Sequence, residues 1–257
     1  MRSNIEWRHW GRIDPLYGVS TLPGKSRLDS QPWTDSEFYA LGAREWSEHL
    51  SQWQTYGLRT SSCVEIGCGA GRITQQLVHT FDHVYALDVS PEMIAYARAR
   101  VTPSERVSYF VTEGQTIPVP SESASAVFSS HVFQHFEAVD DSLIYWEEIY
   151  RVLEPGGTMF VQLPVHRWPW APTIFGAIYG ARRKIGATAA WFKRRRLQAG
   201  GQQLFARLVS YDGDWLLRTL ASIGYARIEL RCIALPEGAY WALLAERPQP
   251  GLTHRPR

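Results

Sequence analysis

The stretch VEIGCGAGRI, residues 64–73, places three glycines directly after a short apolar run. Glycine adopts left-handed backbone conformations freely and has no side chain, so a ligand or another segment can approach its backbone closely. The residues that follow place Ile73, Leu77 and Val78 at helical spacing. The stretch therefore predicts a buried strand, a glycine turn and a helix.

The same alternation of strands and helices continues along the chain. HVYALD predicts a second strand that ends on Asp88, and Ser90 with Pro91 predicts the N-cap and first residue of the next helix. RVSYFV, SAVFSS and TMFVQLP predict three more strands, and this alternation is typical of a doubly wound parallel sheet. YARIELR and YWALLAER predict an antiparallel pair at one edge. We therefore expect an α/β protein with a mostly parallel seven-stranded, Rossmann-like sheet.

Several element boundaries follow from local signals. Residues 1–33 are rich in Trp, Pro and Gly without clear periodicity and predict an irregular arm. TDSE has the spacing of a capping box and predicts a helix from Thr34 to about His49. A helix over residues 137–153 is expected to end at EPGG, and Ser210 is the expected N-cap of the last helix.

Length and composition favour one α/β domain with an added lobe. The chain has 257 residues, of which 45% are hydrophobic, enough for a full core. The N-terminus has no apolar region typical of a signal peptide, and no window reaches the length of a membrane span, so we expect a cytoplasmic protein. Cys63, Cys68 and Cys232 form no CxxC pair and no zinc spacing, so we expect reduced thiols and no metal site.

The charge is unevenly distributed along the sequence. Residues 164–209 contain nine Lys and Arg and no acidic residue, whereas the remainder carries 18 basic and 25 acidic residues. This basic insertion could lie on a membrane surface, cover an anionic acceptor as a lid, or present a solvated face. Trp168, Trp170 and Trp191 accompany it, but no recognisable RNA or DNA module does, which argues against nucleic acid.

The glycine turn and Asp88 together predict a ligand that contains adenosine. Backbone N–H groups at the start of a helix bind ligands there, and an acidic residue about 20 positions later can bind a ribose diol. Gly67 and Asp88 have this separation. A dinucleotide fingerprint needs G-x-G-x-x-G, whereas Gly67, Gly69 and Gly71 give G-x-G-x-G, so the turn has a different shape.

The run VEIGCGAGR resembles motif I of the class I S-adenosylmethionine-dependent methyltransferases of the small-molecule type. The resemblance continues in the family's order through ALDVSPEMIAYAR, EGQTIPVP, VFSSHVFQHF and RVLEPGG, and covers residues 62–163. YDGDWLLRTLASIGY is similar to the family's usual penultimate helix. The chain departs from the family at Glu113-Gly114-Gln115, where a Gly-Asp pair is common, and at Ala126, where an Asp usually begins the fourth strand.

The resemblance implies S-adenosyl-L-methionine as the cofactor and assigns roles to particular residues. Asp88 would bind both ribose hydroxyls, Val89 would pack on adenine, and Glu65 would support the amino group and the turn. The cofactor-binding set that it implies is Glu65, Gly67, Cys68, Gly69, Arg72, Asp88, Val89, Glu113, Gly114, Gln115, Ser129 and Ser130.

His131 and His135 follow the fourth strand and are the candidate catalytic residues. Methyl transfer is an in-line displacement, so alignment of the reacting atoms supplies much of the rate. A base is needed only where the acceptor must lose a proton, and a neutral histidine suits an alcohol or a phenol. The alternative is that the two histidines begin and pack a helix.

We therefore expect a methyltransferase that acts on a small-molecule or lipid-linked acceptor, with oxygen as the accepting atom. A nicotinamide-dependent oxidoreductase and a non-catalytic module that binds S-adenosylmethionine are the alternatives. Peripheral membrane contact through residues 164–209 is one interpretation of the basic insertion. The expected organisation is an N-terminal arm and helix over the acceptor site (1–58), a cofactor-binding core (59–163), a basic lid (164–209) and a helix with two strands that complete the core (210–257).

Overall fold

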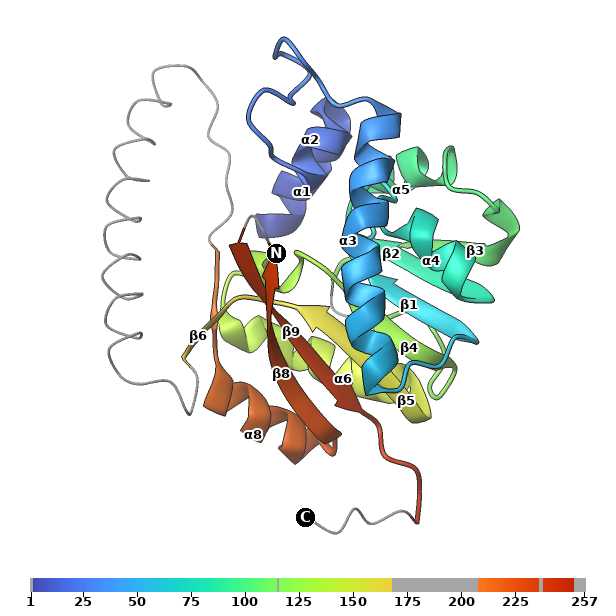
Figure 1. Ribbon diagram of the computed structural model, residues 1–257, viewed down its shortest axis with the longest axis vertical. Coiled ribbons are helices and arrows are strands. Elements are labelled where there is room, and N and C mark those ends of the chain that lie inside the picture. The colour runs from blue at the N-terminus through green and yellow to red at the C-terminus, as the bar shows by residue number, and fades with distance from the viewer. Residues whose placement is uncertain (1, 115, 168–207, 236–237, 252–257) are drawn as a thin grey trace.

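A seven-stranded sheet in the order β3-β2-β1-β4-β5-β9-β8 forms the centre of the protein (Figure 1). The structure is a computed structural model that describes residues 2–114, 116–167, 208–235 and 238–251. Its strands are β1 (Ser62–Ile66), β2 (His83–Asp88), β3 (Val107–Val111), β4 (Ala124–Ser129), β5 (Leu153–Gln162), β8 (Ala226–Leu235) and β9 (Gly238–Glu246). Strands β1 to β5 pair in parallel, and β9 is antiparallel to both β5 and β8. The expected mostly parallel sheet with an antiparallel pair at one edge is confirmed.

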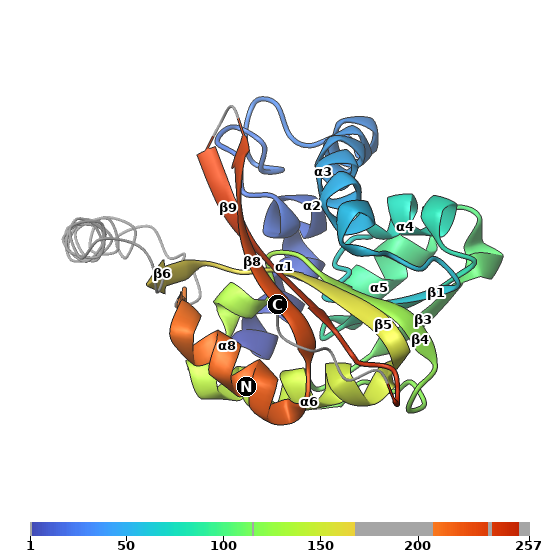
Figure 2. The ribbon, with the colours of Figure 1, turned by 60° about the horizontal axis from the view of Figure 1, so that its bottom comes forward.

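Helices cover both faces of the sheet (Figures 1 and 2). They are α1 (Arg2–Ile13), α2 (Pro15–Val19), α3 (Asp35–Tyr56), α4 (Thr74–Thr80), α5 (Pro91–Arg98), α6 (Ser142–Val152) and α8 (Gly213–Ile223). Trp53 of α3, Leu77 of α4 and Ile94 of α5 belong to one buried apolar cluster. Trp146 of α6 and Leu216 of α8 belong to the cluster on the other face. The result is a three-layer α/β/α arrangement.

Helix α3 begins as predicted and ends later than predicted. The capping box at Thr34 is present. The helix continues past His49 to Tyr56 and ends where Gly57 adopts a left-handed conformation. The extra turns form because Trp53 and Tyr56 are buried against the sheet, which local sequence signals do not show.

Two other boundaries differ from the sequence expectations. The last helix, α8, is capped by Asp212, whose carboxylate accepts hydrogen bonds from two backbone N–H groups of the first turn, and not by Ser210. Helix α6 is shorter than the predicted span of 137–153, because Leu153 already pairs with Ala124 as the first residue of β5.

The prediction of an irregular arm over residues 1–33 is wrong, because much of this segment is helical. Asp14 caps α2 and Pro15 occupies its first turn, a combination that favours helix initiation. Trp10 and Leu16 pack in a third apolar cluster with Met93 of α5. These contacts hold α1 and α2 beside the sheet end that carries the glycine turn.

The two ends of the basic insertion lie next to each other. Strands β6 (Val165–Arg167) and β7 (Tyr211–Asp212) pair in parallel as a separate two-stranded sheet. Residues 168–207 lie outside the described residues, so the expected basic lid falls there for the most part. Within the described part of the chain, no helix is both long enough and apolar enough to cross a membrane.

Candidate functional site

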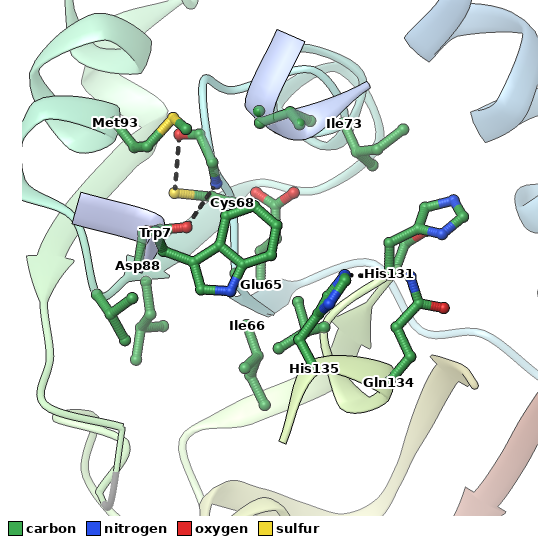
Figure 3. A pocket seen from close by; sticks show the side chains of 18 of the residues that line it. Trp7, Glu65, Ile66, Cys68, Ile73, Asp88, Met93, His131, Gln134 and His135 are labelled. Atoms are coloured by element: carbon green, nitrogen blue, oxygen red, sulfur yellow. Dashed lines mark hydrogen bonds between the residues drawn. The ribbon is translucent and has the colours of Figure 1, made fainter. Parts of the chain in front are cut away.

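A cavity of about 520 Å³ lies at the carboxyl ends of β1, β2 and β4 (Figure 3). Its floor is formed by the glycine turn and by the residues that end the three strands. Side chains of α1 and the segment after α2 form its cover, among them Trp7, Trp10 and Leu22. Parallel α/β sheets bind their ligands at this edge.

The glycine turn adopts the conformation for which its glycines are required. Gly67, Gly69 and Gly71 have φ values of +75°, +52° and +85°. A Cβ atom at Gly67 would lie 2.2 Å from Cγ2 of Val132, and one at Gly69 would lie 2.7 Å from Cγ2 of Val19. The backbone is therefore approached closely by segments of the chain itself, in addition to facing the cavity.

The carboxylate of Asp88 links the end of β2 to the glycine turn. Its Oδ2 accepts a hydrogen bond from the backbone N–H of Gly69, and its Oδ1 accepts one from Ser90, each at 2.9 Å. Burial raises the pKa of Asp88 above its ordinary value, and these backbone donors counteract that shift. Because each carboxylate oxygen has a second lone pair, Asp88 can still accept hydrogen bonds from a ligand diol.

Glu65 is a second buried carboxyl group in the cavity floor. Burial raises its pKa from an ordinary value of 4.5 to about 8, although the hydroxyl of Thr74 donates a hydrogen bond of 2.6 Å to its Oε2. The negative charge of Asp88 nearby adds to the increase. Glu65 therefore holds a proton at neutral pH and can release it when a positively charged group approaches.

The guanidinium of Arg72 lies at one end of the cavity, beside Glu45 of α3. Nη1 of Arg72 forms an ion pair with Glu45, and both residues line the cavity. The Arg72 side chain is 6% exposed, and its Nε is buried without a hydrogen-bond partner. Glu45 is thus the main partner of the positive charge of Arg72.

His131 and His135 both line the cavity, but their rings have different surroundings. The backbone of His131 has φ +60°, a strained conformation for a residue with a side chain, and its ring is reached by solvent in the cavity. Protein atoms surround the ring on most sides, and this enclosure, with the nearby charge of Arg72, lowers the pKa of His131 to about 3. Solvent in the cavity weakens the shift, but the ring is mainly neutral at pH 7 in either case.

The ring of His135 is more constrained than that of His131. Burial lowers the pKa of His135 to about 4. Its Nε2 lies 3.2 Å from Nε2 of Gln134, its Nδ1 is buried without a partner, and Trp7 packs edge-on against it with ring centroids 4.8 Å apart (Figure 3). Among the described residues, none hydrogen-bonds to the His131 ring, so His131 has the freer nitrogen atoms.

Helix α1 is fastened to the loops that follow β2 and β3. Arg8 donates from Nε to the carbonyl of Val89 at 3.0 Å and forms an ion pair of 2.8 Å with Glu113. Asn4 donates to the carbonyl of Glu113 at 2.8 Å. A cover of the site by residues 1–58 was expected from the sequence, but not that α1 contributes to it as a helix, although the i, i+3 spacing of Trp7 and Trp10 is a usable helical signal.

Most of the predicted site residues come together in the cavity. Those that line it are Glu65, Gly67, Cys68, Gly69, Arg72, Asp88, Val89, Ser130, His131 and His135. The Glu113 carboxylate is instead 79% exposed in its ion pair, and the Ser129 hydroxyl donates to the carbonyl of Ile66 at 3.0 Å inside the sheet. Gly114 packs beside the hydroxyl of Tyr145, and Gln115 lies outside the described residues.

Comparison with known proteins identifies the part of the chain that forms the cavity floor. A family model described as a methyltransferase domain matches residues 64–161. The chain is 34% identical over 98 residues to malonyl-[acyl-carrier protein] O-methyltransferase of Hahella chejuensis. This alignment covers 37% of this chain and 34% of that protein. It is 28% identical over 151 residues to ubiquinone biosynthesis O-methyltransferase of Xanthomonas campestris. This alignment covers 52% of this chain and 62% of that protein. The chain thus matches less than two thirds of the length of these relatives.

Solved structures share the fold over nearly the whole chain. The N-methyltransferase NodS of Bradyrhizobium japonicum, in complex with S-adenosyl-L-homocysteine, superposes with a TM-score of 0.59, 15% identity, and coverage of 97% of this chain and 100% of that chain. Magnesium protoporphyrin IX methyltransferase of Synechocystis, with S-adenosylhomocysteine bound, gives a TM-score of 0.60, 13% identity, and coverage of 96% and 97%. At these identities the likeness concerns the fold.

The raised pKa of Glu65 predicts a pH-dependent stability of the ligand-free protein. The folded state holds a proton that the unfolded chain releases, so the stabilisation is complete below about pH 4.5, falls as pH rises, and is lost above about pH 8. Glu65→Gln, which keeps the shape without the titration, should exceed the wild-type melting temperature by several degrees above about pH 8. The measurement is thermal unfolding from pH 4 to pH 9, with the exposed Glu105→Gln as control. A constant difference between Glu65→Gln and wild type at all pH values would contradict the assignment.

Proposed function

We propose that this chain, whose match to a methyltransferase domain and whose relatives and fold support a class I S-adenosylmethionine-dependent methyltransferase, transfers the methyl group of S-adenosylmethionine to an oxygen atom of a small-molecule acceptor. The observation that carries the proposal is the glycine turn held by Asp88 at the end of β2, inside a cavity with neutral histidines at its other end. The names of two relatives, both O-methyltransferases, support oxygen as the acceptor atom.

The residues of the cavity fit this cofactor. S-adenosylmethionine supplies, when bound, a methyl group on a positively charged sulfur that is a good leaving group. Asp88 would accept hydrogen bonds from the ribose hydroxyls, and the backbone of the glycine turn would bind the methionine part. Glu65 would bind the ammonium group as a carboxylate, because a nearby cation favours the loss of its proton. Val89 would pack on the adenine.

The histidines handle the proton of the acceptor. With the cofactor as the source of the methyl group, the part of the chain's own residues would be to accept the hydroxyl proton of the acceptor on an imidazole nitrogen of His131 or His135. Neutral His131 and His135 can accept this proton, whereas protonated rings could not.

Calorimetric titration of the protein with S-adenosylmethionine and with NAD tests the proposed cofactor directly. Saturable binding of S-adenosylmethionine without binding of NAD supports the proposal, and the reverse result supports a nicotinamide-dependent oxidoreductase. Incubation of enzyme and cofactor with a metabolite extract, followed by a mass-spectrometric search for methylated products, then tests turnover. Binding without any methylated product would identify a non-catalytic module.

Asp88→Ala should weaken S-adenosylmethionine binding by roughly 30- to 150-fold. Two charge-assisted hydrogen bonds to the ribose, together about 2–3 kcal/mol, are lost. Asp88→Asn keeps an acceptor oxygen for the backbone N–H of Gly69 and should have an intermediate effect. The measurement is calorimetry, with circular dichroism as the control for folding. An unchanged dissociation constant in folded Asp88→Ala would falsify the ribose assignment.

His131→Asn should lower the rate constant of methyl transfer by roughly 10²-fold or more, the usual contribution of a general base. His135→Asn should cost less, because the nitrogen atoms of His135 are already buried or close to Gln134. The wild-type rate should fall only in acid well below pH 6.5, since enclosure lowers the pKa of both rings and protonation there removes the base. The pH–rate profiles of the three proteins provide the measurement. An acid limb that persists in both variants would place the base elsewhere.

Residues 164–209 guide an acceptor that is anchored in, or delivered from, an anionic membrane surface. The nine positive charges of this segment, without an acidic residue, support this role from the sequence alone. A lipid-linked acceptor would then meet the cavity beside Leu208, which precedes β7 and lines the cavity. The group that receives the methyl is small in either case, whether or not it is attached to a lipid.

Replacing Lys193, Arg194, Arg195 and Arg196 together with Gln should abolish sedimentation with anionic vesicles. Each basic residue near such a surface contributes about 1 kcal/mol, and this attraction is screened by salt. Vesicles with anionic lipid at low and high salt give the measurement, and vesicles of phosphatidylcholine alone provide the control. S-adenosylmethionine affinity should stay constant. Equal sedimentation of wild type and variant would show that these charges serve only as a solvated face.

A further inference from the structure

Three side chains from separate elements surround Gly114 at one corner of the cavity. They are Asn4 of α1, Val89 after β2 and Tyr145 of α6, and all three line the cavity. An ideal Cβ atom on Gly114 would lie 3.0 Å from the hydroxyl of Tyr145 and 3.9 Å from Nδ2 of Asn4. It would lie 3.7 Å from Cγ1 of Val89. The corner thus combines one apolar and two polar side chains around a residue that has no side chain.

The hydroxyl of Tyr145 is available to a ligand. The residue is 7% exposed, and its hydroxyl has no hydrogen-bond partner in the described part of the chain. Phe136 stacks on the ring with centroids 5.0 Å apart, and Phe133 packs against it at an angle, so the ring is held in place. Burial and the nearby charge of Asp88 raise the pKa of Tyr145 to about 12, so the hydroxyl keeps its proton. A ligand with an acceptor atom would satisfy this donor.

The side-chain amide of Asn4 has a fixed orientation. Its Nδ2 donates to the backbone carbonyl of Glu113 at 2.8 Å, and the amide oxygen could not take that place, because a carbonyl only accepts. Asn4 is 6% exposed, and its Oδ1 accepts no hydrogen bond from the described residues. Asn4 therefore offers a ligand an acceptor and not a donor.

The other polar groups of the loop after β3 are already paired. The carboxylate of Glu113 forms its ion pair with Arg8 and is 79% exposed, outside the set of residues that line the cavity. The backbone N–H of Gly114 donates to the hydroxyl of Thr112 at 3.1 Å. The family resemblance assigns cofactor binding to Glu113, but in this structure the unpaired polar groups at the corner are those of Asn4 and Tyr145.

The corner lies where the base of the cofactor would be. In the proposed function the glycine turn binds the methionine part and Asp88 binds the ribose. Val89 follows Asp88 directly, so a base attached to that ribose would pack on Val89 and reach the corner. Adenine carries an amino group that donates hydrogen bonds, beside ring nitrogens that accept them. This edge is complementary to an acceptor on Asn4 and a donor on Tyr145.

We infer that Asn4 and Tyr145 recognise the base of the cofactor: Oδ1 of Asn4 accepts a hydrogen bond from the 6-amino group of adenine, and the hydroxyl of Tyr145 donates to a ring nitrogen beside it. Because the amide of Asn4 cannot turn, the site selects a 6-amino purine over a 6-oxo purine, whose oxygen would face another acceptor. This inference rests on the proposed function. It assigns base selection to a residue outside the matched methyltransferase domain.

Two matched ligands test the selectivity at Asn4. S-adenosylhomocysteine carries a 6-amino purine and S-inosylhomocysteine a 6-oxo purine, and calorimetry at pH 7 measures the binding of each without turnover. Wild type should bind the adenosine compound at least roughly tenfold more tightly. Asn4→Ala should reduce this ratio by about threefold or more, because the oriented acceptor is lost. Ile5→Ala is the control, since Ile5 is the next residue of α1, is 70% exposed and does not line the cavity.

Glu113→Ala separates this assignment from one in which the Glu113 carboxylate turns inward to bind the base. The variant keeps the backbone carbonyl that orients Asn4, so the affinity ratio should stay at its wild-type value. Loss of the ion pair with Arg8 should weaken both ligands equally, because it loosens α1 and not the contact with the base. A ratio that falls in Glu113→Ala and not in Asn4→Ala would overturn the inference.

Tyr145→Phe tests the second hydrogen bond. It should weaken S-adenosylhomocysteine binding by roughly 3- to 10-fold, because the hydroxyl is lost while the ring packing stays. Analogues in which carbon replaces N1 or N7 identify the partner atom, since wild type and Tyr145→Phe should bind the analogue without that atom equally. Tyr150→Phe is the control on the same helix, outside the cavity. Equal weakening of all three ligands in Tyr145→Phe would overturn the hydrogen bond from Tyr145.

The inference and the proposed function can fail separately. Equal affinity of wild type for the two homocysteine compounds, or a ratio that folded Asn4→Ala leaves unchanged, would overturn base selection by Asn4 and leave methyl transfer in place. Binding of neither compound would overturn both. The predicted selectivity without any methylated product from a metabolite extract would refute methyl transfer and leave base recognition in place.

Discussion

The hydrogen bond from the backbone of Gly69 to the carboxylate of Asp88 is the contact on which the site depends. It ties a turn of left-handed glycines to the end of the neighbouring strand, and so fixes where backbone N–H groups face the cavity. Burial disfavours the charge of Asp88, and the two backbone donors favour it, so the carboxylate is both a structural anchor and a polarised acceptor. A change that removes the structural hydrogen bonds of Asp88 would therefore also alter it as a hydrogen-bond acceptor, and the reverse holds as well.

The cavity combines two buried carboxyl groups in its floor with uncharged histidines at its other end. Asp88 and Glu65 suit a ligand that brings positive charge, and the proton on Glu65 reduces repulsion between the two carboxyl groups until such a ligand arrives. His131 and His135 lie where enclosure keeps them uncharged. One end of the cavity thus carries the two buried carboxyl groups, and the other carries the uncharged histidines.

The two halves of the cavity come from different parts of the chain. The floor belongs to residues 64–161, the part that matches the methyltransferase domain. Other lining residues come from outside this span, among them Trp7, Glu45, Leu22 and Leu208. The glycine turn and Asp88 therefore belong to the matched domain, whereas the cover of the cavity comes from segments outside it. The tight packing of Val19 over Gly69 shows that the cover contacts the floor directly.

The sequence alone determined the alternating strands and helices, the glycine turn and the place of Asp88, because these depend on local periodicity and on residues close together in the chain. It did not reveal the helices of the first 19 residues, the full length of α3 or the outward position of Glu113. Those features depend on partners more than 80 residues away, such as the contact of Arg8 with Val89, and no local pattern reports them. Only the tertiary structure brought Leu22 and Leu208 to one cavity, because burial and charge pairing across distant segments decide which side chains face a common cavity.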